Sequence, residues 1–258
     1  MPSPTTPARA VVTPPTDSAG AGRGRLYVGT SGFAYPDWSP RFYPPGLKGD
    51  GLLRHYATRL PAVELNNTFY QSPSESKVAT WVGATPANFR FSVKAQRGGS
   101  WRAFGGSPEP GLPWLTDPYR RFGDRLGTVL FRAPDTAKRD DERLGALLAA
   151  WPPDLPLTLE FRDPSWAADE VVGILRDAGA VLCATEGEDD AKPPDLRRTG
   201  PFLYLRLRRH DYTADELDAW HARLEPFLAA GDDAYVFFRH DETGRGAELA
   251  SELLSRSG

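Results

Sequence analysis

Cysteine and lysine are both scarce in this 258-residue chain. The single cysteine, Cys183, excludes an internal disulfide and any metal cluster built from several cysteines, and it fits a reducing compartment. We expect its side chain to behave as a small buried hydrophobe. Only five of the 31 basic residues are lysine, and the others are arginine, whose planar guanidinium suits bidentate binding of carboxylate or phosphate.

Long apolar runs are also missing. No segment reaches the length of a membrane span. Residues 1–24 are rich in Pro, Thr, Ala and Gly and lack the apolar stretch of a signal peptide, so they are predicted to form a disordered tail. The net charge of -3 implies no attraction of the whole molecule to nucleic acid or to an anionic membrane. We therefore expect a cytoplasmic protein without a membrane anchor, and the sequence points to no particular protein partner.

Eight short apolar segments are predicted to be strands, and helical patterns separate most of them. These strands lie at 26–30, at the start of 63–70, and at 89–94, 128–132, 157–162, 180–184, 202–208 and 234–239. Such alternation across 25–258 predicts a single α/β domain, a (β/α)8 barrel of the TIM type with parallel strands. An open doubly wound sheet is the main alternative. However, Gly29-Thr-Ser-Gly32 lacks the spacing of the dinucleotide-binding fingerprint, and no Walker-type motif is present.

Two segments depart from the regular alternation. Residues 97–116 are rich in Gly, Pro and Trp and are predicted to form a long loop, which in a compact domain is usually functional or mobile. Residues 185–200 are acidic, contain proline and show no amphipathic pattern. The helix that should follow the sixth strand, the sixth helix of the barrel, is therefore predicted to be irregular or missing.

Two helix starts carry the signature of a capping box, in which a Ser or Thr is followed three residues later by Glu. Ser72-Pro-Ser-Glu75 predicts a helix with proline at its first position, and Thr213-x-x-Glu216 predicts another helix.

The stretch Val63-Glu-Leu-Asn-Asn-Thr-Phe-Tyr70 places polar side chains at the end of an apolar strand. Alternation puts Val63 and Leu65 on one face and Glu64 and Asn66 on the other. Burial of these polar groups without partners would cost a few kcal/mol each. The interior of a barrel, or a cleft, is the simplest place that supplies such partners.

Several stretches together resemble a known family: Val28-Gly-Thr-Ser-Gly-Phe33 with Trp38 and Phe42-Tyr-Pro44, Val63–Tyr70, Leu159-Glu-Phe-Arg162 with Pro164-Ser-Trp166, Tyr204-Leu-Arg-Leu207 with Tyr212, and Phe237-Phe-Arg-His-Asp241. The chain resembles the YecE-like proteins, the domain of unknown function family seventy-two, over roughly residues 25–256. The resemblance implies a barrel of the triosephosphate-isomerase type and no particular reaction. Departures from the family pattern are Gln96-Arg97-Gly98 in place of a Thr-His pair, Arg132 in place of Gln, and Arg208-Arg209 in place of His-Gly.

Active sites of such barrels lie at the carboxyl ends of the strands. Glu64 and Glu160 are the candidate general acid or base. The candidate substrate-binding residues are Ser31, Tyr35, Asn66, Tyr70, Lys94, Arg132, Arg162, Trp166, Arg206, Arg208 and His240. Because cations outnumber carboxylates in this set, we expect a positive pocket that suits phosphate or carboxylate.

Two other interpretations of these charges stay open. In the first, they form an internal network that fills the barrel, for example Glu64 with Lys94 and Glu160 with Arg206. In the second, Glu64 and Glu160 are a pair of carboxylates for glycoside chemistry.

Histidines and aromatic rings are weaker signals. Only His240, beside Asp241, lies at a predicted strand end, so a divalent metal is permitted but none is predicted, and no cofactor is expected. The rings of 33–43, with Trp101, Phe104 and Trp114, either stack a base or a sugar or plug the barrel rim. Tyr35, Tyr70 and Trp166 adjoin polar strand ends and are the better binding candidates.

The sequence thus predicts an enzyme of hydrolase or isomerase type that acts on a small anionic substrate, such as a nucleotide, a nucleic-acid fragment or a sugar phosphate. The alternative is a non-catalytic module that binds a ligand or partner through its aromatic rim and the 97–116 segment.

Overall fold

Eight parallel strands form the centre of the molecule, which is described by a computed structural model over residues 22–105 and 112–257. Neighbours in the sheet follow the order β1-β8-β7-β6-β5-β4-β3-β2, as a barrel requires. The strands are β1 (Leu26–Thr30), β2 (Ala62–Leu65), β3 (Arg90–Lys94), β4 (Leu126–Arg132), β5 (Leu157–Glu160), β6 (Val181–Glu186), β7 (Phe202–Leu207) and β8 (Asp233–Phe238).

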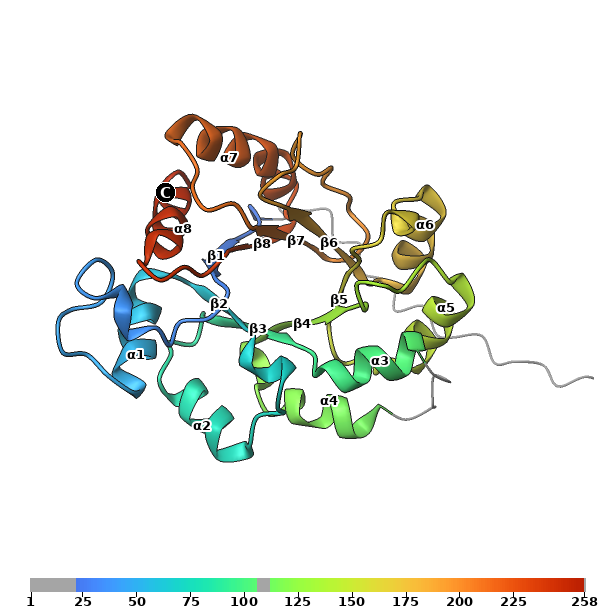
Figure 1. Ribbon diagram of the computed structural model, residues 1–258, viewed down its shortest axis with the longest axis horizontal. Coiled ribbons are helices and arrows are strands. Elements are labelled where there is room, and N and C mark those ends of the chain that lie inside the picture. The colour runs from blue at the N-terminus through green and yellow to red at the C-terminus, as the bar shows by residue number, and fades with distance from the viewer. Residues whose placement is uncertain (1–21, 106–111, 258) are drawn as a thin grey trace, which may run out of the picture.

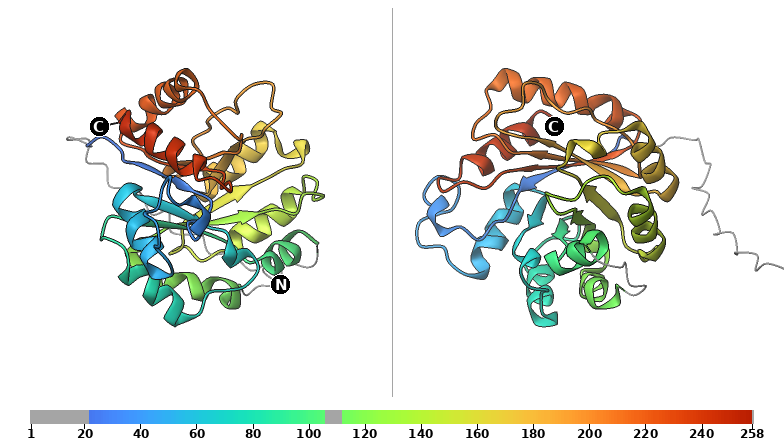
Figure 2. Two further views of the ribbon diagram at one scale, coloured as in Figure 1. Left: turned by 60° about the vertical axis from the view of Figure 1, so that its left-hand side comes forward. Right: turned by 45° about the vertical axis from the view of Figure 1, so that its right-hand side comes forward.

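Helices surround the strands, as Figures 1 and 2 show from three directions. In the described part of the chain they are α1 (Asp50–Arg59), α2 (Glu75–Gly83), α3 (Arg97–Gly105), α4 (Pro113–Arg120), α5 (Asp141–Ala150), α6 (Asp169–Ala178), α7 (Ala214–Ala229) and α8 (Arg245–Ser255). The predicted (β/α)8 barrel is confirmed. None of the helices in the described ranges is long and apolar enough to cross a membrane.

The barrel closes between β1 and β2 mainly through side-chain hydrogen bonds. The Tyr56 hydroxyl, from α1, accepts the Thr30 N–H at 2.8 Å and donates to the Ala62 carbonyl at 2.9 Å. Closer to the carboxyl ends, Gly32 N–H donates directly to the Glu64 carbonyl at 2.8 Å. A Cβ on Gly29 would lie 1.9 Å from the Ala62 oxygen, so this approach of the two strands requires glycine. The result is a nearly closed barrel.

The predicted tail, 1–24, falls largely on residues 1–21, which lie outside the described residues. Residues 23 and 24, the described end of the predicted tail, contact α7. Gly24 N–H donates to the Leu228 carbonyl at 2.8 Å, and Arg23 forms an ion pair with Glu225.

The prediction of a loop at 97–116 is wrong over most of that range, because α3 occupies its beginning and α4 its end. Helix α3 forms despite Gly98 and Gly99, since its buried Phe104 packs edge-on against Trp166 with ring centroids 5.7 Å apart. A Cβ on Gly99 would lie 2.5 Å from a methyl of Leu115 on α4. Tertiary packing here overrides the low helix propensity of glycine.

The missing helix after the sixth strand is confirmed, since the described residues between β6 and β7 contain no helix. Part of this segment hydrogen-bonds to the sheet instead. Thr199 Oγ1 accepts the Leu182 N–H at 2.8 Å, which satisfies a donor on β6. Arg223, from α7, donates to the Pro194 carbonyl at 2.5 Å and so links the segment to that helix.

One of the two predicted capping boxes is correct. Thr213 and Glu216 form the reciprocal hydrogen bonds of a capping box at the start of α7. The other prediction is wrong, because α2 begins at Glu75 and its N-cap is Ser74, which accepts the Lys77 N–H, rather than Ser72.

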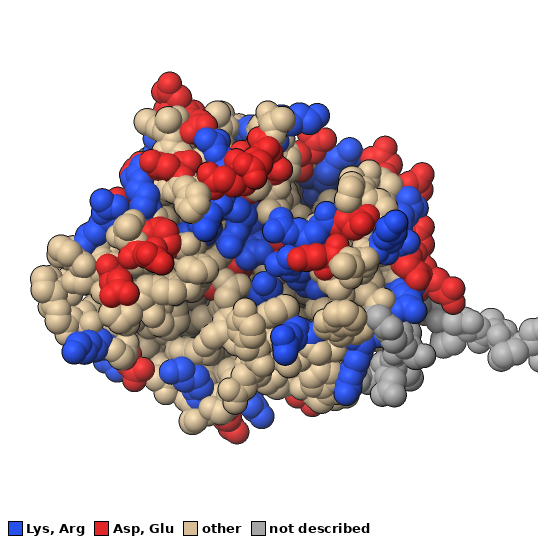
Figure 3. All heavy atoms as spheres, viewed as in Figure 1, with Lys and Arg blue, Asp and Glu red and all other residues tan. Residues whose placement is uncertain are grey.

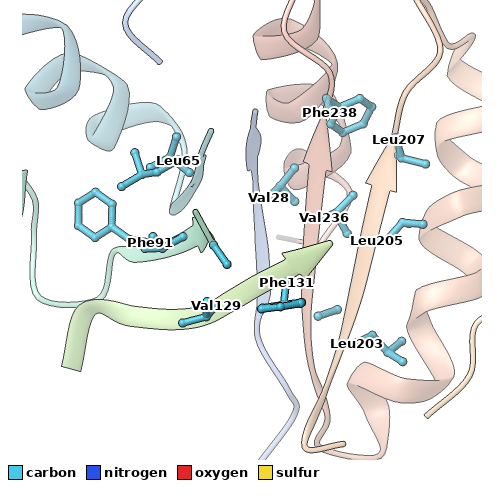
Figure 4. Close-up of a cluster of buried hydrophobic side chains, with 14 of the residues drawn as sticks. Val28, Leu65, Phe91, Val129, Phe131, Leu203, Leu205, Leu207, Val236 and Phe238 are labelled. Carbon is cyan, nitrogen blue, oxygen red and sulfur yellow. The ribbon is translucent and has the colours of Figure 1, made fainter. Parts of the chain in front are cut away.

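Two hydrophobic layers follow from the alternation of side chains along the strands. Leu203, Leu205 and Leu207 point outward into the layer between strands and helices, part of which Figure 4 shows. The opposite faces fill the barrel interior with a second cluster: Tyr27, Ala62, Leu130, Val181, Cys183, Phe202, Tyr204, Tyr235 and Phe237. The expected burial of Cys183 is thereby confirmed. On these inward faces, apolar residues give way to charged ones toward the carboxyl ends of the strands.

Candidate functional site

Arg206 lies at the centre of a buried charged network near the carboxyl ends of the strands. Its Nη1 donates to both carboxylate oxygens of Glu160 at 2.8 Å, and its Nη2 donates to Oε1 of Glu64 at 2.9 Å. The side chain of Arg206 is 4% exposed and those of both glutamates are 0% exposed. The expected convergence of β2, β5 and β7 is therefore found, because each of these residues takes the inward position near the end of its strand.

Glu64 is held by several further donors. Ser31 Oγ, just after β1, and the Tyr204 hydroxyl each donate to the Glu64 carboxylate at 2.8 Å. Burial opposes ionisation of Glu64, but the guanidiniums of Arg206 and Arg208 and these two hydrogen bonds outweigh burial and lower its pKa to about 2. Glu64 is therefore an anion at neutral pH.

Glu160 is ionised for a similar reason. Burial again opposes its charge, yet Arg206 and Arg132 outweigh burial and lower its pKa. Arg132 Nε lies 3.8 Å from the Glu160 carboxylate, and Thr185 Oγ1 donates to it at 3.2 Å. Because a general acid must be protonated at working pH, two ionised carboxylates argue against the arrangement of a glycosidase and favour proton acceptance or charge stabilisation.

Lys94, at the end of β3, is only 8% exposed, and its contacts differ from those of Arg206. Within the described residues its Nζ makes no hydrogen bond and lies within 4.0 Å of no carboxylate. It sits over the Phe69 ring, 4.4 Å from the centroid. Burial and the nearby Arg206 charge lower the pKa of Lys94 to about 8. The hypothesised Glu64–Lys94 pair is thus not formed, whereas the Glu160–Arg206 pair is.

Arg208 is the second cation without a carboxylate partner in the described ranges. It follows β7 directly, is half-buried, and donates from Nη1 to Ser31 Oγ at 2.7 Å. Burial and the neighbouring Arg206 lower the pKa of Arg208 to about 10, so it carries its charge at neutral pH. Ser31 links Arg208 to Glu64 through its hydroxyl.

The remaining predicted arginines lie further out. Arg132 forms an ion pair with Asp135, on the loop after β4. Arg162 follows the end of β5 by two residues and is exposed. Lysine and arginine side chains gather around a hollow over the strands in the view of Figure 3, with aspartate and glutamate side chains beside them.

Three predicted binding residues line two pockets, whose linings include none of Glu64, Glu160 and Arg206. Tyr35 and Asn66 line one of about 380 Å³, together with Leu65 and Trp81. Tyr35 also lines a wider pocket of about 880 Å³ that includes His240 and Arg239. The rings of Tyr35 and His240 are stacked with centroids 5.1 Å apart, and burial, with Arg208 and Arg239 nearby, lowers the pKa of His240.

Two predicted contact residues lie apart from the network. Tyr70 is 72% exposed and packs edge-on against Phe69. Trp166 is buried, stacks on Phe161 at 4.2 Å and donates its ring N–H to the Ala137 carbonyl at 2.8 Å. Phe33, Trp38, Phe42 and Tyr43 are likewise buried, so these rings fill the rim of the barrel rather than forming an open stacking platform.

Three network members were not among the predicted site residues. Tyr204 and Ser92, whose oxygens are 2.6 Å apart, share the inward faces of Arg206 and Lys94, so strand alternation was the available signal. Thr185 was missed because the sixth strand was predicted to end at 184, whereas β6 continues to Glu186. Over the described residues, no group of three His, Cys, Asp or Glu is placed to hold a metal ion.

Known proteins are similar to this chain in sequence and in fold. The model of a family described as "Protein of unknown function DUF72" matches residues 27–258. The chain belongs to this family. The predicted resemblance is therefore confirmed. The UPF0759 protein YunF of Bacillus subtilis (strain 168) is 23% identical over 268 residues, which cover 89% of this chain and 93% of that protein.

Solved structures of DUF72 family proteins share the fold. One from Thermotoga maritima MSB8 is 25% identical with a TM-score of 0.78, covering 90% of this chain and 99% of that chain. Another, from Enterococcus faecalis V583, is 20% identical with a TM-score of 0.72, covering 91% and 98%. These similarities establish the barrel and the family, and the chemistry must be argued from the residues of the mouth.

Proposed function

We propose that this DUF72 protein is an enzyme that binds a small anionic, phosphate-bearing substrate at the carboxyl-end mouth of its barrel. A nucleotide, a nucleic-acid fragment and a sugar phosphate all fit this description. The observation that carries the proposal is that Lys94 and Arg208 lie at the mouth without a carboxylate partner among the described residues.

Unpaired buried charge is unfavourable, so its presence requires an explanation. Removing a cation from water costs several kcal/mol unless an anion or a set of hydrogen bonds replaces the water. Arg206 has two carboxylates, whereas Lys94 has an aromatic ring and Arg208 has one serine hydroxyl. A substrate anion that reaches both cations would supply the missing partner, with Arg132 able to assist from β4.

Arg206, Glu64 and Glu160 have a different role in this proposal. Their mutual hydrogen bonds fix the geometry of the mouth, and the two ionised carboxylates are the proton acceptors available to the reaction. A substrate long enough to extend from the mouth past Asn66 and Tyr35 would place its uncharged part in the pocket that these two residues line.

The test is binding of inorganic phosphate and of phosphate-bearing metabolites, measured by thermal shift and calorimetry. Arg208→Gln should weaken binding about tenfold to a hundredfold, since a hydrogen bond to a charged group contributes about 1.5–3 kcal/mol. The matched control is Arg176→Gln, an exposed arginine on α6, which should leave binding unchanged. The proposal would be contradicted if both variants lost phosphate affinity equally, or if neither lost any.

A non-catalytic binding module remains the second candidate, and one observation favours it. Trp101 on α3 and Trp114 on α4 are 62% and 42% exposed, which is high for such large rings. A module that binds through these rings should be insensitive to Arg208→Gln and should lose its ligand in a Trp101→Ser, Trp114→Ser double variant.

A further inference from the structure

We propose that Lys94 is a nucleophile that forms an imine with an aldehyde or ketone group of the substrate. This inference rests on the proposed function and extends it, because it names anionic carbonyl compounds as the substrate class. Lys94 then has a chemical role in the reaction, beyond holding an anion.

Lys94 is set apart from the other lysines of the chain. All five lie in the described ranges, and Lys48, Lys77, Lys138 and Lys192 are exposed while Lys94 is buried. Its Nζ, at the mouth, is not engaged by any hydrogen bond or ion pair within the described residues. The amine thus lies over the Phe69 ring on a side chain that is mostly buried, and no protein acceptor in the described ranges occupies it.

Its surroundings favour the neutral amine, the form that attacks carbonyl carbon. The low pKa, about 8, arises from burial and from the Arg206 charge. Roughly a tenth of the Lys94 side chains are then neutral at pH 7, against fewer than roughly one in a thousand for an ordinary lysine. A desolvated lysine beside a second cation is a recognised way to activate an amine for imine formation.

The reaction balances with groups that the mouth supplies. The neutral Nζ attacks the carbonyl carbon, and the carbonyl oxygen takes up a proton to give a carbinolamine. The C–O bond then breaks and the oxygen leaves as water with a second proton. The nitrogen has given up the two protons that the oxygen takes up, and it keeps the new double bond to carbon. Glu64 and Glu160 are the ionised groups nearby that can accept the proton released by nitrogen. In this proposal Arg208, at the same mouth, holds the phosphate of the same molecule.

The experiment traps the imine by reduction. Glyceraldehyde 3-phosphate and sodium cyanoborohydride are added to the full chain at neutral pH, and peptide mass mapping locates the adduct. Lys94 should be labelled at least tenfold faster than the four exposed lysines, which serve as internal controls. Its labelling rate should rise with pH through about 8. Equal labelling of all five lysines, or labelling only of the exposed ones, would overturn the inference.

Two variants and two competitors separate this inference from the proposed function. Lys94→Arg, which keeps the charge, should lose the adduct while Arg208 still binds phosphate. Lys94→Met, used if the arginine variant does not fold, should lose the adduct and bind phosphate more weakly. Inorganic phosphate should slow labelling in the wild type and not in Arg208→Gln. If phosphate binds through Arg208 and no Lys94 adduct forms, the inference fails and the proposed function stands. If neutral glyceraldehyde labels Lys94 equally fast and phosphate has no effect on the rate, the substrate need not be an anion. Both proposals then fail on that point.

Discussion

Arg206 Nη1 donates to both carboxylate oxygens of Glu160 at 2.8 Å, in an ion pair whose side chains are 4% and 0% exposed. The same guanidinium donates to Glu64 through Nη2. One cation thus neutralises part of the charge of two anions that come from β2 and β5. We infer that this part of the mouth is structural. We infer also that Lys94 and Arg208, which have no carboxylate partner among the described residues, are the functional part.

The first prediction concerns the removal of Arg206. Arg206→Met leaves Glu64 and Glu160 buried without their shared cation, so it should reduce the free energy of unfolding by about 3–5 kcal/mol. Urea denaturation at neutral pH measures this. The control is the triple variant Glu64→Gln, Glu160→Gln, Arg206→Met, which leaves no uncompensated charge and should recover most of the loss. A triple variant that is less stable than the single one would contradict a structural network.

The second prediction concerns acid. The pKa of Glu64 in the folded protein, about 2, is below its ordinary value of 4.5, so ionised Glu64 adds stability above the unfolded pKa. That contribution is lost as the pH falls from about 4.5 through about 2. The difference in unfolding free energy between wild type and Glu64→Gln should therefore be constant above pH 5.5 and shrink between pH 4.5 and 2. A difference that does not change with pH in this window would show that Glu64 is not held as an anion.

Much of the fold could be predicted from residue periodicity. Alternation along β7 placed Tyr204, Arg206 and Arg208 on one face, and the carboxyl ends of parallel strands must meet at one rim. This reasoning brought Glu64, Glu160 and Arg206 together correctly. It also indicated the missing helix between β6 and β7, because an acidic, proline-containing segment offers no apolar face to pack.

Partner choice and local packing could not be predicted in this way. Periodicity gives the face of Lys94, but whether its amine reaches Glu64 depends on the stagger of the strands and on side-chain rotamers. Helix α3 was missed because its stability comes from Phe104 and from the close approach of Gly99 to Leu115, which are contacts between distant segments. Trp166 stands beside a polar strand end in sequence, yet its ring turns into the layer shared with Phe161.

The central claim is that Lys94 and Arg208 serve to bind a ligand and that they lower the stability of the folded protein. The variant Lys94→Met tests this claim most directly. The pKa of Lys94 in the folded protein, about 8, is below the ordinary 10.5, so its charge destabilises the folded state below pH 8. This cost is relieved as the pH rises from about 8 to 10.5.

The measurement is the free energy of unfolding in urea of wild type and Lys94→Met, without ligand, at pH 7 and at pH 9.5. The account predicts that the variant is more stable by about 1–3 kcal/mol at pH 7 and that this advantage narrows at pH 9.5. A variant that is less stable than wild type at pH 7 would show that Lys94 holds the barrel together and would contradict the account.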